Sequence, residues 1–248
     1  MRRLPALLAR DPAAGFPDPE TALSEPNGLL AIGGDLSPER LLDAYGQGIF
    51  PWFLEGQPIL WWSPDPRTVF RTDALRLSSR FRRSLRRSAW RVCADTSFAE
   101  VIDACANAPR PGQSGTWITA QMRAAYLRLH RLGHAHSVEV FDGERLVGGL
   151  YGVAVGRMFF GESMFSACSG GSKVALAALA GKLAQWEWPL LDAQVANDHL
   201  LGLGAERMPR RDFLAQVRKL ASGPRQAGSW TRPFGQVAAR TVEQRIHS

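Results

Sequence analysis

The spacing of apolar residues along the chain predicts six helices. Within them, apolar side chains recur every three or four positions, the period that gathers side chains on one face of a helix. Ser37 is suited to cap the first helix, with Pro38 in its first turn and Gly46 after its end, and Gly133 is suited to end the fourth. The predicted helices span residues 38–45, 75–87, 97–108, 119–132, 172–186 and 211–220.

Between the fourth and fifth helices the pattern changes to apolar runs that are typical of strands. The Asp142-Gly143 pair, which separates the first two runs, predicts a hairpin turn. After the last helix we expect a polar tail. Helices, an antiparallel meander, and then a helix and a strand predict an α+β fold. The predicted strands are HSVEVF at 136–141, ERLVGGLYGVAV at 144–155, RMFFGESMF at 157–165 and PLLDAQV at 189–195.

The first quarter of the chain differs in composition from the rest. It is rich in Pro and Gly, and it ends in a stretch dense in aromatic residues that is closed by Pro64 and Pro66. Such Pro-bounded segments are typical of domain junctions. We therefore expect a small N-terminal domain at residues 1–65 and a larger domain at residues 66–248.

Composition narrows the class of protein. The 248 residues, 45% of them hydrophobic, suffice for a sizeable core. No stretch reaches the roughly 18–20 apolar residues of a membrane-spanning helix. The apolar stretch at the N-terminus is broken by Pro5 and Arg10, and the three cysteines are too few for a disulfide framework. We expect a cytoplasmic protein with no membrane partner.

Positive charge is concentrated in the second predicted helix of a chain whose net charge is +7. Leu77, Phe81 and Leu85 form one apolar stripe of this helix, and arginines occupy most of the rest. A solvated helix face explains most charge runs. Here the near absence of acids favours a phosphate-binding surface, because a merely soluble face mixes both signs. The arginines expected to contact nucleic acid are Arg76, Arg80, Arg82, Arg83, Arg86 and Arg87.

Distinctive sequence motifs follow one another along most of the chain. They are EPNGLLAIGGDL, GIFPWF, WWSPDPR, GTWIT, LGHAHSVEV, GGLYGV, GESMFS and DAQVANDH. In this order they resemble the leucyl/phenylalanyl-tRNA–protein transferases over about residues 15–215. The resemblance implies a small N-terminal domain followed by a larger domain of the GNAT acyltransferase type.

The resemblance also implies a reaction. Leu or Phe (Met less well) would pass from an aminoacyl-tRNA to acceptor proteins that begin with Arg or Lys, which marks the products for degradation by the N-end rule. An aminoacyl ester is already activated, so the enzyme has only to align an amine with a carbonyl, manage one proton and stabilise an oxyanion. We therefore expect no cofactor and no metal. The expected partners are the tRNA 3′ end and the acceptor protein, bound by a monomer.

Asp192 and Gln194 are the candidate catalytic residues. They stand two positions apart on a predicted strand, so both side chains are expected to face the same way. An amide oxygen only accepts hydrogen bonds, and it suffices here because an α-amino group titrates near about 7.7–8.0. We expect Gln194 to aim the attacking amine and Asp192 to hold the Gln194 amide. A capped polar strand end is the alternative that the residues alone leave open.

Glu162 is a lone acid inside an apolar strand, where a carboxylate needs a partner. The partner is either an internal Arg or backbone group, or the cationic first side chain of the acceptor protein. The resemblance favours the acceptor.

Several aromatic and apolar residues match positions that line the substrate site in the family. Aromatic residues of this kind are usually core, but Trp52 and Trp117 match the site for the amino acid and the terminal adenosine. Stacking on a base is worth about 1–3 kcal/mol, enough for a few rings to hold a tRNA end. Leu150, Phe160 and Met164 match the wall of the amino-acid pocket, and Tyr45 and Tyr126 match supporting positions.

The sequence favours aminoacyl transfer over two other functions, and it argues against a metal site. An acyl-CoA-dependent N-acetyltransferase would need a CoA-binding loop, which the chain lacks. A non-catalytic RNA-binding module would leave Asp192, Gln194 and Glu162 unexplained. His134 and His136 are expected to be polar partners near the core, because no third metal ligand stands at a suitable spacing.

Overall fold

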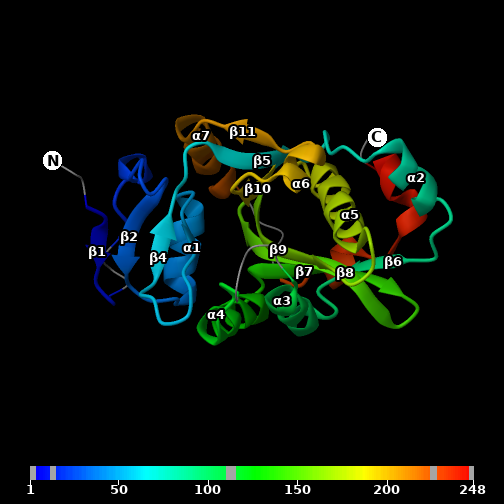
Figure 1. Cartoon of the computed structure of the whole chain (residues 1–248), viewed down its shortest axis with the longest axis horizontal. Coiled ribbons are helices and arrows are strands. Elements are labelled where there is room, and N and C mark those ends of the chain that lie inside the picture. Colours follow the sequence, from blue (N-terminus) through cyan, green and yellow to red (C-terminus); the bar gives the residue numbers. More distant parts are fainter. Residues whose placement is uncertain (1–3, 12–14, 110–115, 224–227, 246–248) are drawn as a thin grey trace.

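The computed structural model describes residues 4–11, 15–109, 116–223 and 228–245. The N-terminal part forms a four-stranded sheet with the order β1-β2-β4-β3, in which β1 and β2 are parallel. Helix α1 lies between this sheet and the rest of the molecule (Figure 1). The elements are β1 (Ala6–Leu8), a 3-10 turn (Pro19–Thr21), β2 (Leu29–Gly33), α1 (Pro38–Gly46), β3 (Phe50–Pro51) and β4 (Leu60–Trp62).

An eight-stranded sheet begins at Arg67 and has the order β11-β5-β10-β9-β8-β7-β6-β12. Its neighbouring strands are antiparallel except for β9 and β10, which run parallel. The strands are β5 (Arg67–Arg71), β6 (Arg91–Ala94), β7 (Ala135–Asp142), β8 (Arg145–Val155), β9 (Met158–Ser166), β10 (Leu190–Gln194), β11 (Glu206–Met208) and β12 (Val237–Ala238).

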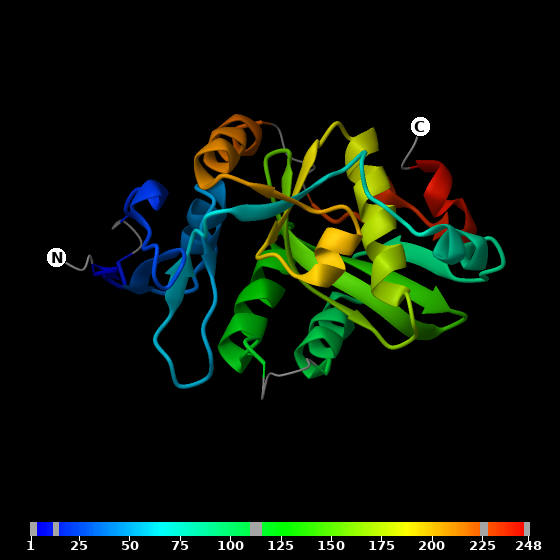
Figure 2. The same ribbon diagram turned by 45° about the horizontal axis from the view of Figure 1, so that its top comes forward.

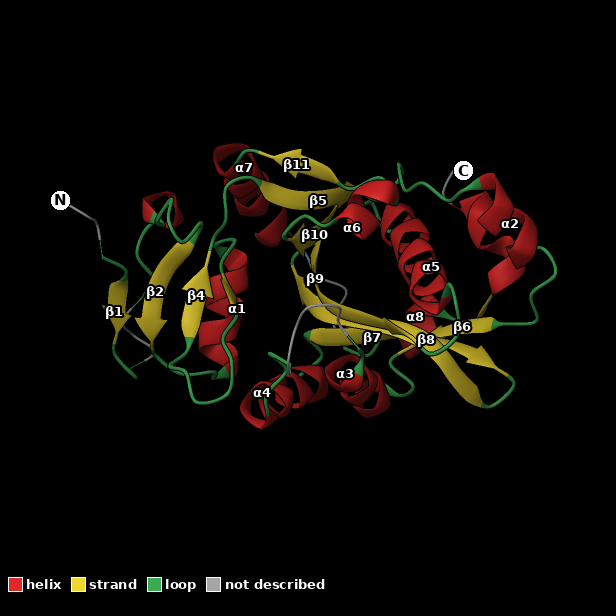
Figure 3. Ribbon diagram, viewed as in Figure 1, coloured by secondary structure: helices red, strands yellow, loops and turns green. Residues whose placement is uncertain are grey.

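Helices cover both faces of the larger sheet (Figure 3). Helices α3 (Phe98–Asn107) and α4 (Ala120–Arg131) pack on one face of β7 and β8, and α5 (Gly171–Gln185) packs on the other. Most residues of α5 are buried, as expected of a helix that is apolar on all sides. Figure 2 shows α6 (Asp198–Gly202) on one side of α5 and α2 (Ser79–Leu85) on the other.

The prediction of a fold that mixes helices with an antiparallel meander is confirmed. The first and third to sixth predicted helices correspond to α1, α3, α4, α5 and α7 (Arg210–Ala221), with ends that differ by one residue at most. The predicted hairpin joins β7 to β8, where Asp142 pairs with Arg145 and Gly143 has φ +59°. None of the described helices is long and apolar enough to cross a membrane.

The prediction of a helix over residues 75–87 is too long. The Ser78 hydroxyl accepts the Phe81 N–H at 3.3 Å and starts α2 at Ser79. Upstream, the Arg76 N–H bonds the carbonyl of Leu203 at 2.8 Å, which holds this residue outside the helix. The arginine-rich segment is therefore an irregular stretch at residues 74–78 that leads into a short helix.

The prediction of a polar tail is wrong for the described residues after 228. They form α8 (Thr231–Phe234), β12 and a 3-10 turn (Ala239–Arg245). Trp230 and Val242 are fully buried, and β12 pairs with β6. A few apolar side chains spread through a polar segment are enough to anchor it on the sheet and on α5.

Candidate active site

The predicted catalytic residues lie where the parallel strands β9 and β10 separate. Backbone pairing between the two strands is registered at Leu191 with Phe159 and at Asp192 with Phe160. Two residues further along each strand, the Gln194 side-chain Nε2 donates to Glu162 Oε1 at 2.8 Å. A side-chain hydrogen bond therefore joins the strands beyond their last backbone pairs, at the carboxyl end of β10.

Gln194 has an unusual backbone conformation. Its φ is +61°, and the register of β10 against β5 shifts between Asp192 and Gln194. A left-handed residue that is not glycine costs on the order of 1–2 kcal/mol, so the surroundings have to hold it in place. The Asp192 carboxylate does so by accepting the Gln194 backbone N–H at 2.9 Å. The expected simple alternation of side chains along this strand is interrupted at Gln194.

Asp192 is fully buried and paired with an arginine that the sequence did not single out. Arg67 donates to Asp192 through Nε at 2.8 Å and through a terminal nitrogen at 2.6 Å, and both side chains are 0% exposed. The guanidinium lies between the rings of Phe50 and Phe213, at 4.7 and 4.6 Å from their centroids. Its other terminal nitrogen donates to the Gly48 carbonyl at 3.1 Å. This bidentate pair fixes Asp192 in one orientation.

The geometry revises the expected contact between Asp192 and Gln194. Asp192 holds the backbone amide of Gln194, whereas the side-chain amide is held by Glu162. Strand periodicity cannot reveal this arrangement, because it depends on a register shift and on a left-handed residue. The lone acid in the apolar run LLDAQ does signal that a buried cation must pair with it, but nothing local selects Arg67 from the other arginines.

Glu162 is the centre of a buried cluster of polar side chains. Tyr45 donates to Glu162 Oε1 and Tyr126 to Glu162 Oε2, each at 2.7 Å, and the two hydroxyls lie 2.5 Å apart. Among the described residues, no arginine and no backbone group makes a hydrogen bond to Glu162, although both were expected as alternative partners. The tyrosines come from α1 and α4, so the cluster joins the N-terminal part of the chain to the larger sheet.

Burial raises the pKa of Glu162 to about 7, although the hydrogen bonds from Tyr126 and Tyr45 act in the opposite direction. Burial, followed by the charge of Glu162, also raises the pKa of both tyrosines well above 10. The two phenols carry only two hydrogens for the three oxygen–oxygen contacts of the cluster. A proton on Glu162 supplies the third: the protonated carboxyl group donates to one phenol, which then donates to the other phenol instead of to Glu162, so the neutral acid gives every contact a hydrogen.

The two residues expected to hold the tRNA tip come from different parts of the chain: Trp52 follows β3 in the N-terminal part, and Trp117 lies just before α4. Trp52 is 43% exposed, and its ring lies 5.7 Å from that of Trp62, whose indole N–H donates to the Trp52 carbonyl at 2.7 Å. Trp117 is partly buried against the core cluster that contains Tyr45 and Tyr126. A half-exposed, fixed indole is available for stacking, and Trp52 meets that description.

The residues expected in the amino-acid pocket are not all brought together. Leu150 and Met164 face each other across β8 and β9, and both pack with the core that contains α5. Phe160 is fully buried in the other core, with its ring 5.2 Å from that of Tyr45. Phe160 therefore lies with the Glu162 cluster rather than with Leu150 and Met164.

The arginines of the 75–87 segment are almost all exposed. Leu85 is buried and Phe81 partly buried, which confirms the predicted apolar stripe at these two positions. No ion pair within the described residues involves Arg76, Arg80, Arg83 or Arg87. Arg82 is half-buried and donates to Ser79 Oγ at 3.4 Å. At Arg76, Arg80, Arg83 and Arg87 this surface therefore presents cationic groups that described acids do not neutralise.

The two histidines in the LGHAHSVEV motif do not form a metal site with described residues. His136 Nδ1 lies 2.9 Å from an oxygen of Asp95, and its ring stacks on Trp230 at 3.9 Å. Within the described ranges, no cluster of three His, Cys, Asp or Glu side chains is arranged to hold a metal. His136 is a packed polar partner in the core.

Comparisons with known proteins agree with the motifs. A family model for leucyl/phenylalanyl-tRNA protein transferase matches residues 69–218, and a model for the N-terminal domain of that family matches residues 34–65. A leucyl/phenylalanyl-tRNA–protein transferase of Xanthomonas euvesicatoria pv. vesicatoria is 68% identical over 96% of this chain and 95% of that protein. The transferase of the same name from Xanthomonas axonopodis pv. citri is 68% identical over 97% of both chains.

Solved structures add little. A conserved protein of unknown function from Staphylococcus epidermidis matches with a TM-score of 0.40 and 11% identity, covering 73% of this chain and 68% of that one. A similarity this low supports no argument about function. The sequence matches, which cover nearly the whole chain, show the family: the chain belongs to the leucyl/phenylalanyl-tRNA protein transferase family.

Proposed function

We propose that the protein transfers Leu or Phe (Met less well) from aminoacyl-tRNA to the N-terminal Arg or Lys of acceptor proteins. The reaction forms a peptide bond and marks the product for degradation by the N-end rule. Membership of the family and the names of its relatives support aminoacyl transfer from tRNA to protein. The ester supplies the driving force, so the protein's task is alignment.

One observation carries this proposal: the orientation of the Gln194 amide. Its Nε2 is bound to Glu162, and no hydrogen bond from a described residue reaches its oxygen. That oxygen is therefore available to accept a hydrogen bond from the attacking α-amino group and to aim its lone pair at the ester carbonyl. A misplacement of about 1 Å costs on the order of 10²-fold in rate, so a fixed acceptor contributes substantially.

Asp192 acts through Gln194 rather than on the substrate. It is fully buried, and its oxygens are occupied by Arg67 and the Gln194 N–H. Its negative charge close to Gln194 favours the positive charge that develops on the attacking nitrogen. The departing ribose hydroxyl, or its neighbour, takes the proton, which leaves an amide and a free tRNA end.

Glu162 is proposed to recognise the cationic first side chain of the acceptor, with Tyr45 and Tyr126 holding its carboxyl group. An approaching cation favours the ionised carboxylate over the neutral acid. Acceptor binding would therefore release the proton that completes the hydrogen-bonded cluster.

For the donor, we propose that Trp52 and Trp117 hold the terminal adenosine while Leu150 and Met164 form the apolar amino-acid pocket. Phe160, whose ring packs 5.2 Å from that of Tyr45, would support this pocket indirectly through Tyr45. One methylene of misfit is worth about 1–3 kcal/mol, which gives moderate selectivity with leakage to Met. The tRNA body would lie on Arg76, Arg80, Arg82, Arg83, Arg86 and Arg87.

The architecture proposed for this reaction is a small N-terminal domain at residues 1–65 and a GNAT-like catalytic domain at residues 66–248, in a cytoplasmic monomer. The start of the larger sheet at Arg67 and the separation of β9 from β10 at the site support it.

The decisive assay is transfer of labelled leucine from leucyl-tRNA to a protein with an N-terminal Arg, beside the same protein with a blocked N-terminus. We expect labelling of the free protein alone, without added nucleotide and in the presence of a chelator. Acetylation of the same acceptor from acetyl-CoA would instead favour the rival acetyltransferase, and RNA binding without any transfer would favour the rival binding module.

A further inference from the structure

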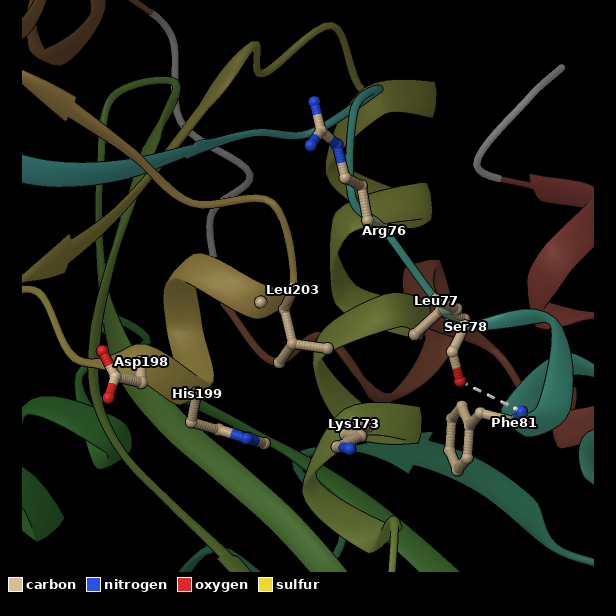
Figure 4. Close-up of a pocket in the computed structure, with 9 residues that line it drawn as sticks. Arg76, Leu77, Ser78, Phe81, Lys173, Asp198, His199 and Leu203 are labelled. Atoms are coloured by element: carbon tan, nitrogen blue, oxygen red, sulfur yellow. Dashed lines mark hydrogen bonds between the residues drawn. The ribbon is translucent and has the colours of Figure 1, made fainter.

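A cavity of about 200 Å³ lies between α2, α5 and α6, and its lining does not include Glu162, Asp192 or Gln194. Figure 4 shows the residues that line it, and three of them are basic: Arg76, Lys173 and His199. The one acid in the lining, Asp198, lies on the far side of His199 from Lys173. Ligand pockets for larger molecules measure about 300–1,000 Å³, so this cavity suits a small group such as a phosphate.

Lys173 is held in place by packing. Lys173 Nζ lies 5.6 Å from the centre of the Phe81 ring. Phe81 in turn fits against Gly170, where an added Cβ would come within 2.5 Å of the ring, so only glycine allows this approach. No ion pair within the described residues neutralises Lys173 or Arg76. Burial, followed by the charge of Lys173, lowers the pKa of His199, which is the response expected in a cavity that lacks a neutralising anion.

The backbone adds to this positive field. Helix α5 is fifteen residues long and begins at Gly171, which places Lys173 in its first turn. The N-terminal end of a helix of this length carries a partial positive charge that favours anions. Side chains of α5, α6 and the segment 76–81 therefore line one cavity close to this helix end.

The cavity also lies close to both proposed contacts of the tRNA. On one side, Arg76 and Phe81 connect it directly to the arginines of α2. On the other, His199 follows Gln194 by five residues, which limits their separation to about 18 Å. The cavity is therefore within reach of an RNA strand that extends from α2 and ends with its ester at Gln194.

We propose that this cavity binds a backbone phosphate of the single-stranded 3′ end of the tRNA, through Lys173 and His199. The inference rests on the proposed function, because it takes the anion to be part of the aminoacyl-tRNA. It assigns Lys173 and His199 to binding the donor and leaves the transfer step to Gln194.

The test compares two donors. Leucyl-tRNA carries the phosphates, and leucyl-adenosine carries the same ester on a nucleoside without a phosphate. The variant Lys173→Ala should lower kcat/KM for leucyl-tRNA about threefold to fivefold at physiological salt, the effect of losing one phosphate contact from a single strand. With leucyl-adenosine it should leave kcat/KM unchanged. Lys173→Arg, which keeps the charge, should behave like the wild type.

The matched control is Lys182→Ala, which removes a lysine from the same helix nine residues further along, outside the cavity lining. It should leave both donors unaffected. A second measurement is the binding of uncharged tRNA, in which Lys173→Ala should flatten the slope of log K against log salt by about 0.7.

Equal losses with both donors, or no loss with either, would overturn the phosphate site. If the wild type transferred leucine from neither donor, the proposed function would fall. The binding measurement would then still decide the phosphate site, because an unchanged salt slope in Lys173→Ala contradicts it.

Discussion

Replacing Arg67 by Met tests whether the buried ion pair holds the catalytic strand. The substitution keeps an unbranched side chain of similar length and removes the cation that reaches both oxygens of Asp192, at 2.8 and 2.6 Å. Asp192 then keeps a single described donor, the backbone N–H of Gln194. A carboxylate that is 0% exposed would be left in the core without a counter-charge.

The expected cost is large. Breaking a buried pair by removing one partner destabilises a protein by about 3–5 kcal/mol, compared with about 5–15 kcal/mol for the whole stability of a typical domain. The double variant Arg67→Met with Asp192→Asn removes both charges and keeps an acceptor for the Gln194 N–H. It should recover most of the loss, because the penalty comes from the unpaired charge rather than from the lost pair.

The assay is urea unfolding at neutral pH followed by tryptophan fluorescence, since Trp61 and Trp230 are fully buried. Each variant is also tested for single-turnover transfer. A loss below about 1 kcal/mol together with normal transfer would refute the reasoning, because so small an effect is typical of an exposed pair.

Two further predictions concern the substrates. Because burial raises the pKa of Glu162 to about 7, its side chain is neutral below that pH and ionised above it, so KM for an acceptor with N-terminal Arg should fall as pH rises through about 7. Glu162→Gln should raise this KM and abolish the change in KM near pH 7 that comes from Glu162. If KM depended on pH as in the wild type, the acceptor site would be contradicted. Changing both Arg86 and Arg87 to Ala should weaken tRNA binding whatever the aminoacyl group and flatten the salt slope by about 1.4–1.8, whereas the pair Arg218→Ala and Lys219→Ala on α7 should not. An unchanged slope in the first pair would remove α2 from the RNA surface.

Local patterns predicted most of the architecture. Helices such as α4 and α5 carry their periodicity and their end signals within one segment, so the sequence located them to within a residue. The pattern does not reveal the true start of α2, because Ser78 caps the helix and the carbonyl of Leu203, just after α6, binds the Arg76 N–H. Trp230 was missed as an anchor because one buried indole leaves no periodic pattern.

The site was predictable in its residue types but not in its connections. Asp192, Gln194 and Glu162 stand out as polar groups inside apolar strands, and the family motifs indicate further site residues such as Tyr45 and Tyr126. Their bonds depend on pairings between distant segments: Arg67 and Asp192 are 125 residues apart, and Tyr45 and Glu162 are 117 apart. The left-handed backbone of Gln194 is a consequence of these contacts, and no local signal precedes it.

Transfer by a Gln194 variant tests the central claim most directly. The wild type and Gln194→Ala are mixed with saturating leucyl-tRNA and an acceptor peptide that begins with Arg, and a single turnover is followed. If the Gln194 oxygen aims the amine, the rate constant should fall by about 10²-fold while the affinity for tRNA stays the same. A rate constant within twofold of the wild type would contradict the account.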